Sequence, residues 1–79
     1  MTYNSKITGN IIRRLRIERH LTQEVLSGLA GIARSHLAMI ENGNKNPNVE
    51  TLWRIAWAFE IPLSDLFKII EKEMNLENK

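Results

Sequence analysis

The chain has 79 residues, of which 43% are hydrophobic, and it contains no cysteine. This length allows one small domain with a modest core, and the lack of cysteine excludes disulfides and thiolate metal sites. No apolar run is long enough to span a bilayer, and the N-terminus lacks the pattern of a signal peptide. We therefore expect one soluble cytoplasmic domain, residues 1–79, with a core from about 7 to 74 and loose ends.

The net charge of +2 is unevenly distributed along the chain. Residues 1–54 carry eight basic and four acidic side chains, whereas residues 55–79 carry three basic and five acidic ones. A basic half suits a polyanion, and a mildly acidic half suits a protein partner. An unevenly charged, solvated surface would explain the same distribution.

Helical periodicity organises the first half of the chain. Residues 1–6 are polar and expected to be frayed or only partly helical. A first amphipathic helix then runs from Ile7 to near His20, with the apolar positions Ile7, Ile11, Ile12 and Leu15. Thr22 is a good N-cap for a short second helix, whose expected buried face consists of Val25, Leu26, Leu29 and Ala30. Gly31 ends this helix, because glycine readily takes a positive φ and a side chain there would crowd the preceding helix.

Three further helices follow. The third is predicted from Arg34 to Asn42, with Leu37 and Ile40 buried and Gly43 as a left-handed stop. After a loop, Asn48 caps a fourth helix with the inward residues Leu52, Ile55, Ala56 and Phe59. The fifth helix follows Pro62 and runs from Leu63 to about Met74, and a loose tail begins at Asn75. The apolar residues of this helix are Leu66, Phe67, Ile69 and Ile70. The pattern shows no strand-like alternation, and it predicts a compact all-α fold of five helices.

Two short helices about a glycine are weak evidence for a helix-turn-helix, but the surrounding residues agree with one. They are Leu21-Thr22-Gln23-Glu24, Ala30-Gly31-Ile32, Arg34-Ser35, Ile40-Glu41-Asn42-Gly43, Pro47 and Thr51-Leu52-Ile55-Ala56. From roughly Ile11 to Phe67 the chain resembles the lambda-repressor-like, Cro/XRE-type helix-turn-helix family. Within it the chain is most similar to controller proteins of restriction-modification systems and to small phage-type repressors.

The resemblance implies a homodimer that binds a palindromic operator in double-stranded DNA, with the third helix in the major groove. The positions that would read bases are Arg34, Ser35, Ala38 and Met39. Arg34 is the strongest, because a guanidinium can bond both acceptors of a guanine, although a phosphate contact or a solvated arginine are alternatives. RNA polymerase is a candidate further partner, whereas no cofactor, metal, small-molecule ligand or membrane contact is expected.

Phosphate contacts would supply much of the affinity. Gln23 matches the family position that grips a phosphate at the start of the second helix, where the helix N-terminus favours an anion. The other residues expected to contact phosphates, with plain solvation as the alternative, are Arg13, Arg14, His36, Asn44, Lys45 and Asn46.

Two internal features also follow from the resemblance. Arg16 and Glu41 match a family ion pair that joins the first and third helices, the alternative being two separately solvated charges. The chain departs from the family pattern at Val25, where a glutamate usually completes the capping box, and at Ala33, where a serine or threonine usually caps the third helix. The missing cap forgoes about 1 kcal/mol of local stability.

Trp53 and Trp57 lie one helical turn apart on the outward side of the fourth helix. Two large aromatic side chains on such a face suggest a homodimer interface, whose apolar centre would also include Phe67, Ile70 and Met74. The alternative is that both indoles pack within one subunit.

No glycine-rich phosphate loop, metal-spaced His set or nucleophile-base pair supports an enzyme. We therefore expect a sequence-specific DNA-binding transcriptional regulator, with a restriction-modification controller protein as the first interpretation. A phage-type repressor is the alternative, as is an antitoxin or adaptor that acts mainly through protein contacts at Trp53 and Trp57.

Overall fold

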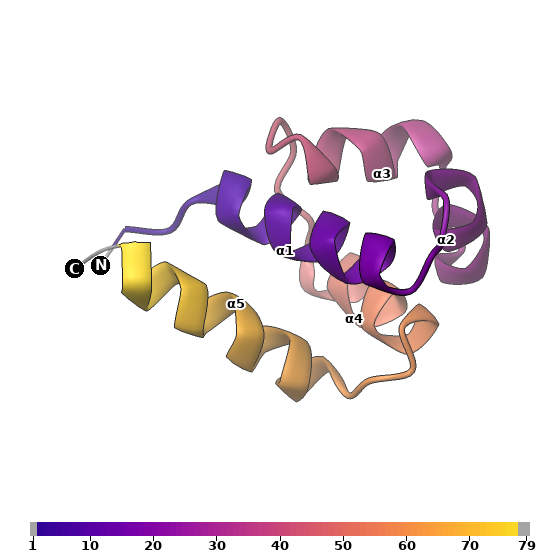
Figure 1. Cartoon of the computed structure of the whole chain (residues 1–79). Helices are drawn as coiled ribbons and strands as arrows, with labels where there is room; N and C mark the ends of the chain where they lie inside the picture. Colours follow the sequence, from indigo (N-terminus) through magenta and orange to yellow (C-terminus); the bar gives the residue numbers. More distant parts are fainter. Residues whose placement is uncertain (1, 78–79) are drawn as a thin grey trace.

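The computed structural model describes residues 2–77, and this part of the chain contains five α-helices and no strand. They are α1 (Ser5–Glu18), α2 (Gln23–Ala30), α3 (Arg34–Glu41), α4 (Val49–Ala58) and α5 (Leu63–Glu77). α1 lies between α3 on one side and α5 on the other, and α2 closes one end of the molecule (Figure 1). The expected all-α class and the order of five helices are confirmed. None of these helices combines the length and apolar composition needed to cross a bilayer.

The ends of α1 and α5 differ from those predicted from the sequence. α1 begins two residues earlier than expected, because Oδ1 of Asn4 accepts a hydrogen bond from the backbone N–H of Lys6 at 2.9 Å. It ends before His20, whose φ of 56° takes the chain out of the helix. α5 continues through residues 75–77, so the predicted loose tail is wrong there, while residues 1, 78 and 79 lie outside the described residues.

The four connections between helices contain the same kind of hydrogen-bonded turn. In each, a backbone N–H bonds to the carbonyl five residues earlier, in the pairs Leu21 to Arg16, Ile32 to Ser27, Asn44 to Met39 and Ile61 to Ala56. In all four, the residue before the N–H donor has a left-handed backbone conformation, with φ of 70° at Gly31, 84° at Gly43, 56° at His20 and 60° at Glu60. Glycine accepts this conformation without steric cost. A Cβ at Gly31 would meet the guanidinium of Arg54 in α4 at 3.0 Å, rather than α2 as expected.

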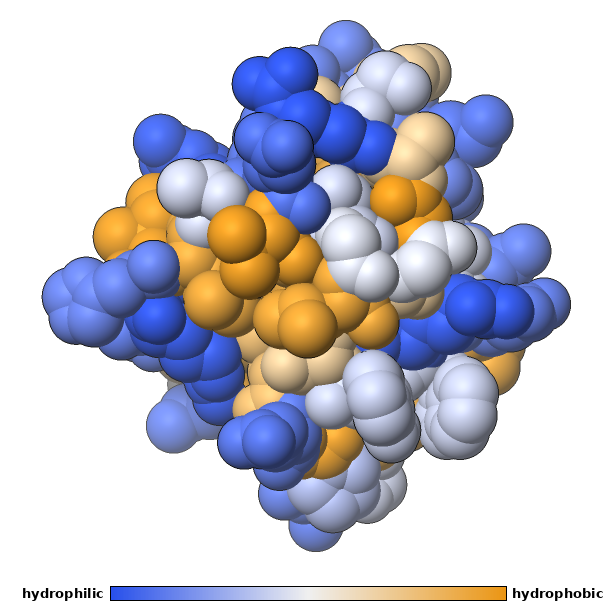
Figure 2. All heavy atoms as spheres, turned by 90° about the vertical axis from the view of Figure 1, so that its right-hand side faces the viewer, coloured by the Kyte–Doolittle hydropathy of each residue, from blue (hydrophilic) through white to orange (hydrophobic). Residues whose placement is uncertain are grey.

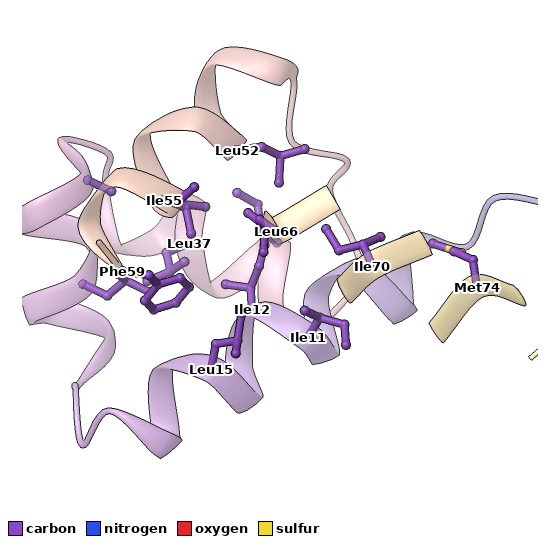
Figure 3. Close-up of a cluster of buried hydrophobic side chains, with 14 residues drawn as sticks. Ile11, Ile12, Leu15, Leu37, Leu52, Ile55, Phe59, Leu66, Ile70 and Met74 are labelled. Carbon is purple, nitrogen blue, oxygen red and sulfur yellow. The ribbon is translucent and has the colours of Figure 1, made fainter. Parts of the chain in front are cut away.

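Buried apolar side chains from all five helices form a single core. Figure 3 shows Ile12, Leu37, Ile55 and Leu66 close together in its middle, and each of them is fully buried. α2 contributes only Leu26 and Ala30, with Ser27 also buried. The predicted burial of Val25 and Leu29 is wrong, because these side chains are 47% and 49% exposed. A helix of eight residues has room for one inward stripe, and these two lie outside it.

Candidate nucleic-acid interface

α3 divides into an inward stripe and a free outward face. Leu37 and Ile40 are fully buried, whereas Arg34, Ser35 and Met39 are exposed. Within residues 2–77, the side chains of these three exposed residues make no hydrogen bond or ion pair. Ala38, between the two sides, is half-buried. The four residues expected to read bases therefore share one side of α3, on which the fold partly covers only Ala38.

The start of α3 lacks the cap that the other short helices have. Thr22 accepts a hydrogen bond from the N–H of Val25 at 3.1 Å, and Asn48 accepts one from Thr51 at 2.8 Å. Ala33, at the equivalent place before α3, makes no side-chain cap. The expected lack of a side-chain cap at this position is confirmed. The first backbone N–H groups of α3 consequently remain available to water or to a ligand.

One arginine holds the end of α3 in place. Nε of Arg16 donates to Oε2 of Glu41 at 2.7 Å, and Nη2 donates to Oε1 at 3.0 Å. The two side chains are only 12% and 2% exposed, so the predicted ion pair is confirmed and lies inside the protein. The remaining Nη1 donates to the carbonyl of Leu21 at 2.8 Å. The guanidinium therefore joins α1, the connection before α2, and α3.

Gln23 extends this network toward the surface. Its Nε2 donates to Oε1 of Glu41 at 3.2 Å, an interaction that the sequence did not suggest. A side-chain amide carries two N–H donors, so one remains for another acceptor. The buried carboxylate of Glu41 thus fixes the direction of the Gln23 amide at the start of α2.

α1 and α3 cross at very short range at Gly9. A Cβ on Gly9 would collide with the carbonyl oxygen of Ile40 and would lie 2.8 Å from that of Glu41. Oγ of Ser5 also donates to the carbonyl of Gly43 at 3.0 Å, just beyond α3. The signal for this contact was a lone glycine inside an amphipathic helix, which usually has a packing reason. We call this region, with the Arg16 and Glu41 pair, the α1/α3 seam.

Most of the residues expected to contact phosphates surround α3. The backbone N–H groups of Asn44 and Lys45 both donate to the carbonyl of Met39, at 3.0 and 3.2 Å, so this exposed loop folds back over the last turn of α3. Asn46, the next residue, is also exposed. On the α1 side, Arg13 lines a hollow of about 310 Å³ together with Gln23, Ala38, Glu41 and Asn42.

Arg14 and His36 are placed differently from this group. Nη1 of Arg14 lies 3.7 Å from a carboxylate oxygen of Glu73, which directs Arg14 toward α5, on the opposite side of α1 from α3. His36 is half-buried on α3. Of the two neighbouring arginines of α1, only Arg13 lies beside the outward face of α3.

Comparison with known proteins agrees with this geometry. Residues 12–66 match the helix-turn-helix family HTH_3. The chain belongs to this Cro/XRE-type helix-turn-helix family. It is therefore a DNA-binding transcriptional regulator, and its relatives are regulators and not enzymes.

Three relatives show how far the likeness extends. Control protein C.MunI of Mycoplasma sp is 38% identical over 66 residues, which are 82% of this chain and 89% of that protein. The cryptic phage CTXphi repressor RstR of Vibrio cholerae is 31% identical over 68 residues, 86% of this chain and 60% of that protein. The crystal structure of the restriction-modification controller protein C.AhdI of Aeromonas hydrophila superposes with a TM-score of 0.75 at 31% identity, covering 78% of this chain and 94% of that one.

This helix-turn-helix regulator also carries an apolar surface between α2 and α4. Trp53 and Trp57 are 57% and 65% exposed, which excludes the alternative that both indoles pack within one chain. They line neighbouring hollows on the α2 side of α4 together with Leu29 and Ile61. We call these four residues the tryptophan face. Figure 2, which looks onto the α2 end of the molecule, shows a broad apolar area ringed by hydrophilic side chains.

The other residues expected at a homodimer interface do not join the tryptophan face. Ile70 and Met74 are 7% and 3% exposed, and Figure 3 shows them continuing the core along α5, so they do not form the predicted single apolar centre with the two indoles. Phe67 is partly exposed and lines a separate hollow with Tyr3, Ile70 and Met74. The hollow is lined by the N-terminal segment and α5, and the N-terminal segment lies beside the end of α5, opposite the α2 end (Figure 1).

Proposed function

We propose that this regulator is a restriction-modification controller protein that binds a palindromic operator as a homodimer through α3. The observation that carries the proposal is the outward side of α3, where Arg34, Ser35 and Met39 are exposed and their side chains bond to nothing in the described part of the chain. The likeness to C.MunI and C.AhdI supports the controller assignment, because it extends over 89% and 94% of those chains. A phage-type repressor is the second candidate, supported by the likeness to RstR.

Base reading would rest mainly on Arg34. Its exposed guanidinium lies in the first turn of α3, from which it can reach O6 and N7 of a guanine in the major groove. Met39 and the half-buried Ala38 present apolar surface suited to a thymine methyl group. Ser35 can donate or accept, so it specifies little by itself.

Phosphate binding would occur on both sides of α3. On the α2 side, the second N–H of the Gln23 amide is directed by Glu41, and the start of α2 adds its favourable dipole. Arg13 lies on the same side. Past the end of α3, Asn44, Lys45 and Asn46 provide exposed donors, and His36 is a further donor on α3 itself. Together these groups would hold α3 in register with the bases, as phosphate contacts do in other complexes.

Dimerisation would double the number of bases read. One short recognition helix contacts only a few base pairs, and a two-fold dimer places two such helices in half-sites roughly 34 Å apart. The tryptophan face is the surface that we assign to the dimer contact, because exposed aromatic side chains in an apolar patch mark interfaces. An adaptor that binds another protein through this face is an alternative, and the DNA measurement below separates the two.

The test is binding to an operator selected from a random duplex library, measured at several salt concentrations. We expect Arg34→Ala to abolish discrimination at one guanine per half-site, worth about 1–3 kcal/mol, while Lys45→Ala weakens all sequences alike and lowers the salt slope by about one. Lys72→Ala, on α5, is the matched control and should change neither quantity. Equal losses on all sequences for Arg34→Ala would contradict base reading, and failure to select any operator would favour the adaptor.

The position of the selected operator in the source genome separates the two regulatory candidates. An operator beside a methyltransferase and endonuclease pair supports the controller protein. An operator among phage lysogeny genes would replace that assignment by the phage-type repressor, leaving the DNA-binding mechanism unchanged.

A further inference from the structure

The first turn of α1 packs directly against the turn that follows α3. Ser5 donates to the carbonyl of Gly43, and a Cβ built on Gly43 would lie 2.6 Å from Cγ of Lys6 and 3.0 Å from its Cα. Because Gly43 has no Cβ, the aliphatic part of the Lys6 side chain can pack directly against it. The first turn of α1 and the loop that contains Lys45 form one continuous surface, although 39 positions separate the two lysines in the sequence.

This surface carries positive charge without compensation. Lys6 is exposed, and no ion pair engages it among residues 2–77. The first turn of α1 has no acidic residue. Glu41, the carboxylate at the α1/α3 seam, is buried and already paired with Arg16. A phosphate is the ligand that would balance exposed lysine charges at such a place.

The position of Lys6 also fits the path of a DNA strand. Lys6 and Arg13 are seven residues apart in α1, so they lie on the same side of that helix, two turns or about 10.5 Å apart. Arg13 lines the hollow beside Ala38, and Lys6 lies beside the turn beyond α3. The two cations therefore follow α3 along its length, next to the groove that α3 would occupy.

We propose that Lys6 binds a backbone phosphate of the DNA, acting with Lys45 across Gly43. The first turn of α1 is then part of the DNA interface, beyond the helix-turn-helix itself. This inference rests on the proposed function, since it assigns a further contact to the same DNA complex.

The experiment measures the affinity of Lys6→Ala for the selected operator and for an unrelated duplex between 50 and 300 mM salt. Loss of one phosphate contact should reduce the salt slope by about 0.9 and weaken both duplexes by about fivefold at 0.15 M salt. Lys68→Ala, which removes an exposed lysine of α5, is the matched control and should match the wild type. The double variant Lys6→Ala with Lys45→Ala should lower the slope by about twice as much.

Three outcomes overturn the proposal. A Lys6→Ala slope equal to that of Lys68→Ala shows that Lys6 contacts no phosphate. A loss confined to the operator shows that Lys6 recognises sequence and not the backbone. A wild-type chain without salt-dependent DNA binding removes the proposed function, and the contact with it. An unchanged thermal midpoint for Lys6→Ala, as we expect, excludes a general loss of structure.

Discussion

The α1/α3 seam and the tryptophan face differ in which side chains they bury: the seam buries charged groups, whereas the tryptophan face leaves large apolar groups exposed. In the seam, the polar groups of Arg16 and Glu41 are buried and fully engaged, and backbone meets backbone at Gly9. On the tryptophan face, Trp53 and Trp57 remain more than half exposed. The seam is complete within one chain, whereas the tryptophan face leaves apolar surface in water.

This difference separates two tasks within a small protein. The orientation of α3 is set by contacts that the chain makes with itself. Pairing with a second copy would depend on a surface that contributes little to the fold. Variants in the two regions should therefore affect different measurements, and the following three changes test this, from the largest expected effect on stability to the smallest.

Arg16→Ala should have the largest effect. It leaves the 2% exposed carboxylate of Glu41 without its cation, and loss of one partner from a buried pair costs about 3–5 kcal/mol of unfolding free energy. Urea denaturation measures the loss. Replacing both residues, as Arg16→Met with Glu41→Leu, should recover most of it because no charge remains buried. A loss below about 1 kcal/mol for Arg16→Ala would mean that the pair is not buried in solution.

Gly9→Ala should destabilise the protein by about 2 kcal/mol, because the added Cβ would push α1 away from the carbonyl of Ile40. Gly28→Ala is a well-matched control, since a Cβ on this glycine of α2 would meet nothing within 4 Å. There the same substitution should stabilise by about 0.5–1 kcal/mol through helix propensity. If both variants shifted the urea midpoint in the same direction, the close crossing of α1 and α3 would be wrong.

Trp53→Ala and Trp57→Ala should change the unfolding free energy of the monomer by no more than about 0.5 kcal/mol, because exposed side chains contribute little to the fold. Sedimentation equilibrium should instead show the dimer mass of the wild type falling to that of the monomer. Phe67→Ala, on the separate hollow near Tyr3, serves as the control for a general loss of apolar surface. A dimer that survives both tryptophan changes places the two-fold contact elsewhere.

Sequence reasoning recovered the features that depend on local spacing. Apolar periodicity located all five helices, and short polar residues marked the caps at Thr22 and Asn48. The Arg16 and Glu41 pair came from the family resemblance, since 25 positions separate the two residues. None of these predictions needed the packing angles between helices.

The missed features all depend on how helices meet. The spacing of Leu29 fits a core position as well as a surface one, because a short apolar helix does not reveal which of its stripes faces inward. In the longer α5, spacing likewise does not show whether Ile70 and Met74 face the core or a partner. A lone glycine in an amphipathic helix marks Gly9, but its partner, the backbone of α3, follows only from the way in which α1 and α3 cross. The hydrogen bond from Gln23 to Glu41 likewise requires a contact between residues 18 positions apart. Spacing along one helix contains no information on such contacts.

The free outward side of α3 has a consequence for how such regulators diversify. Arg34, Ser35 and Met39 are exposed and make no side-chain bond within residues 2–77, so their replacement leaves the core and the α1/α3 seam intact. A duplicated gene could therefore acquire a new operator through a few substitutions while its product still folds. If α3 reads bases as proposed, substitutions at these positions are limited by the DNA sequence to be bound, and not by the stability of the protein.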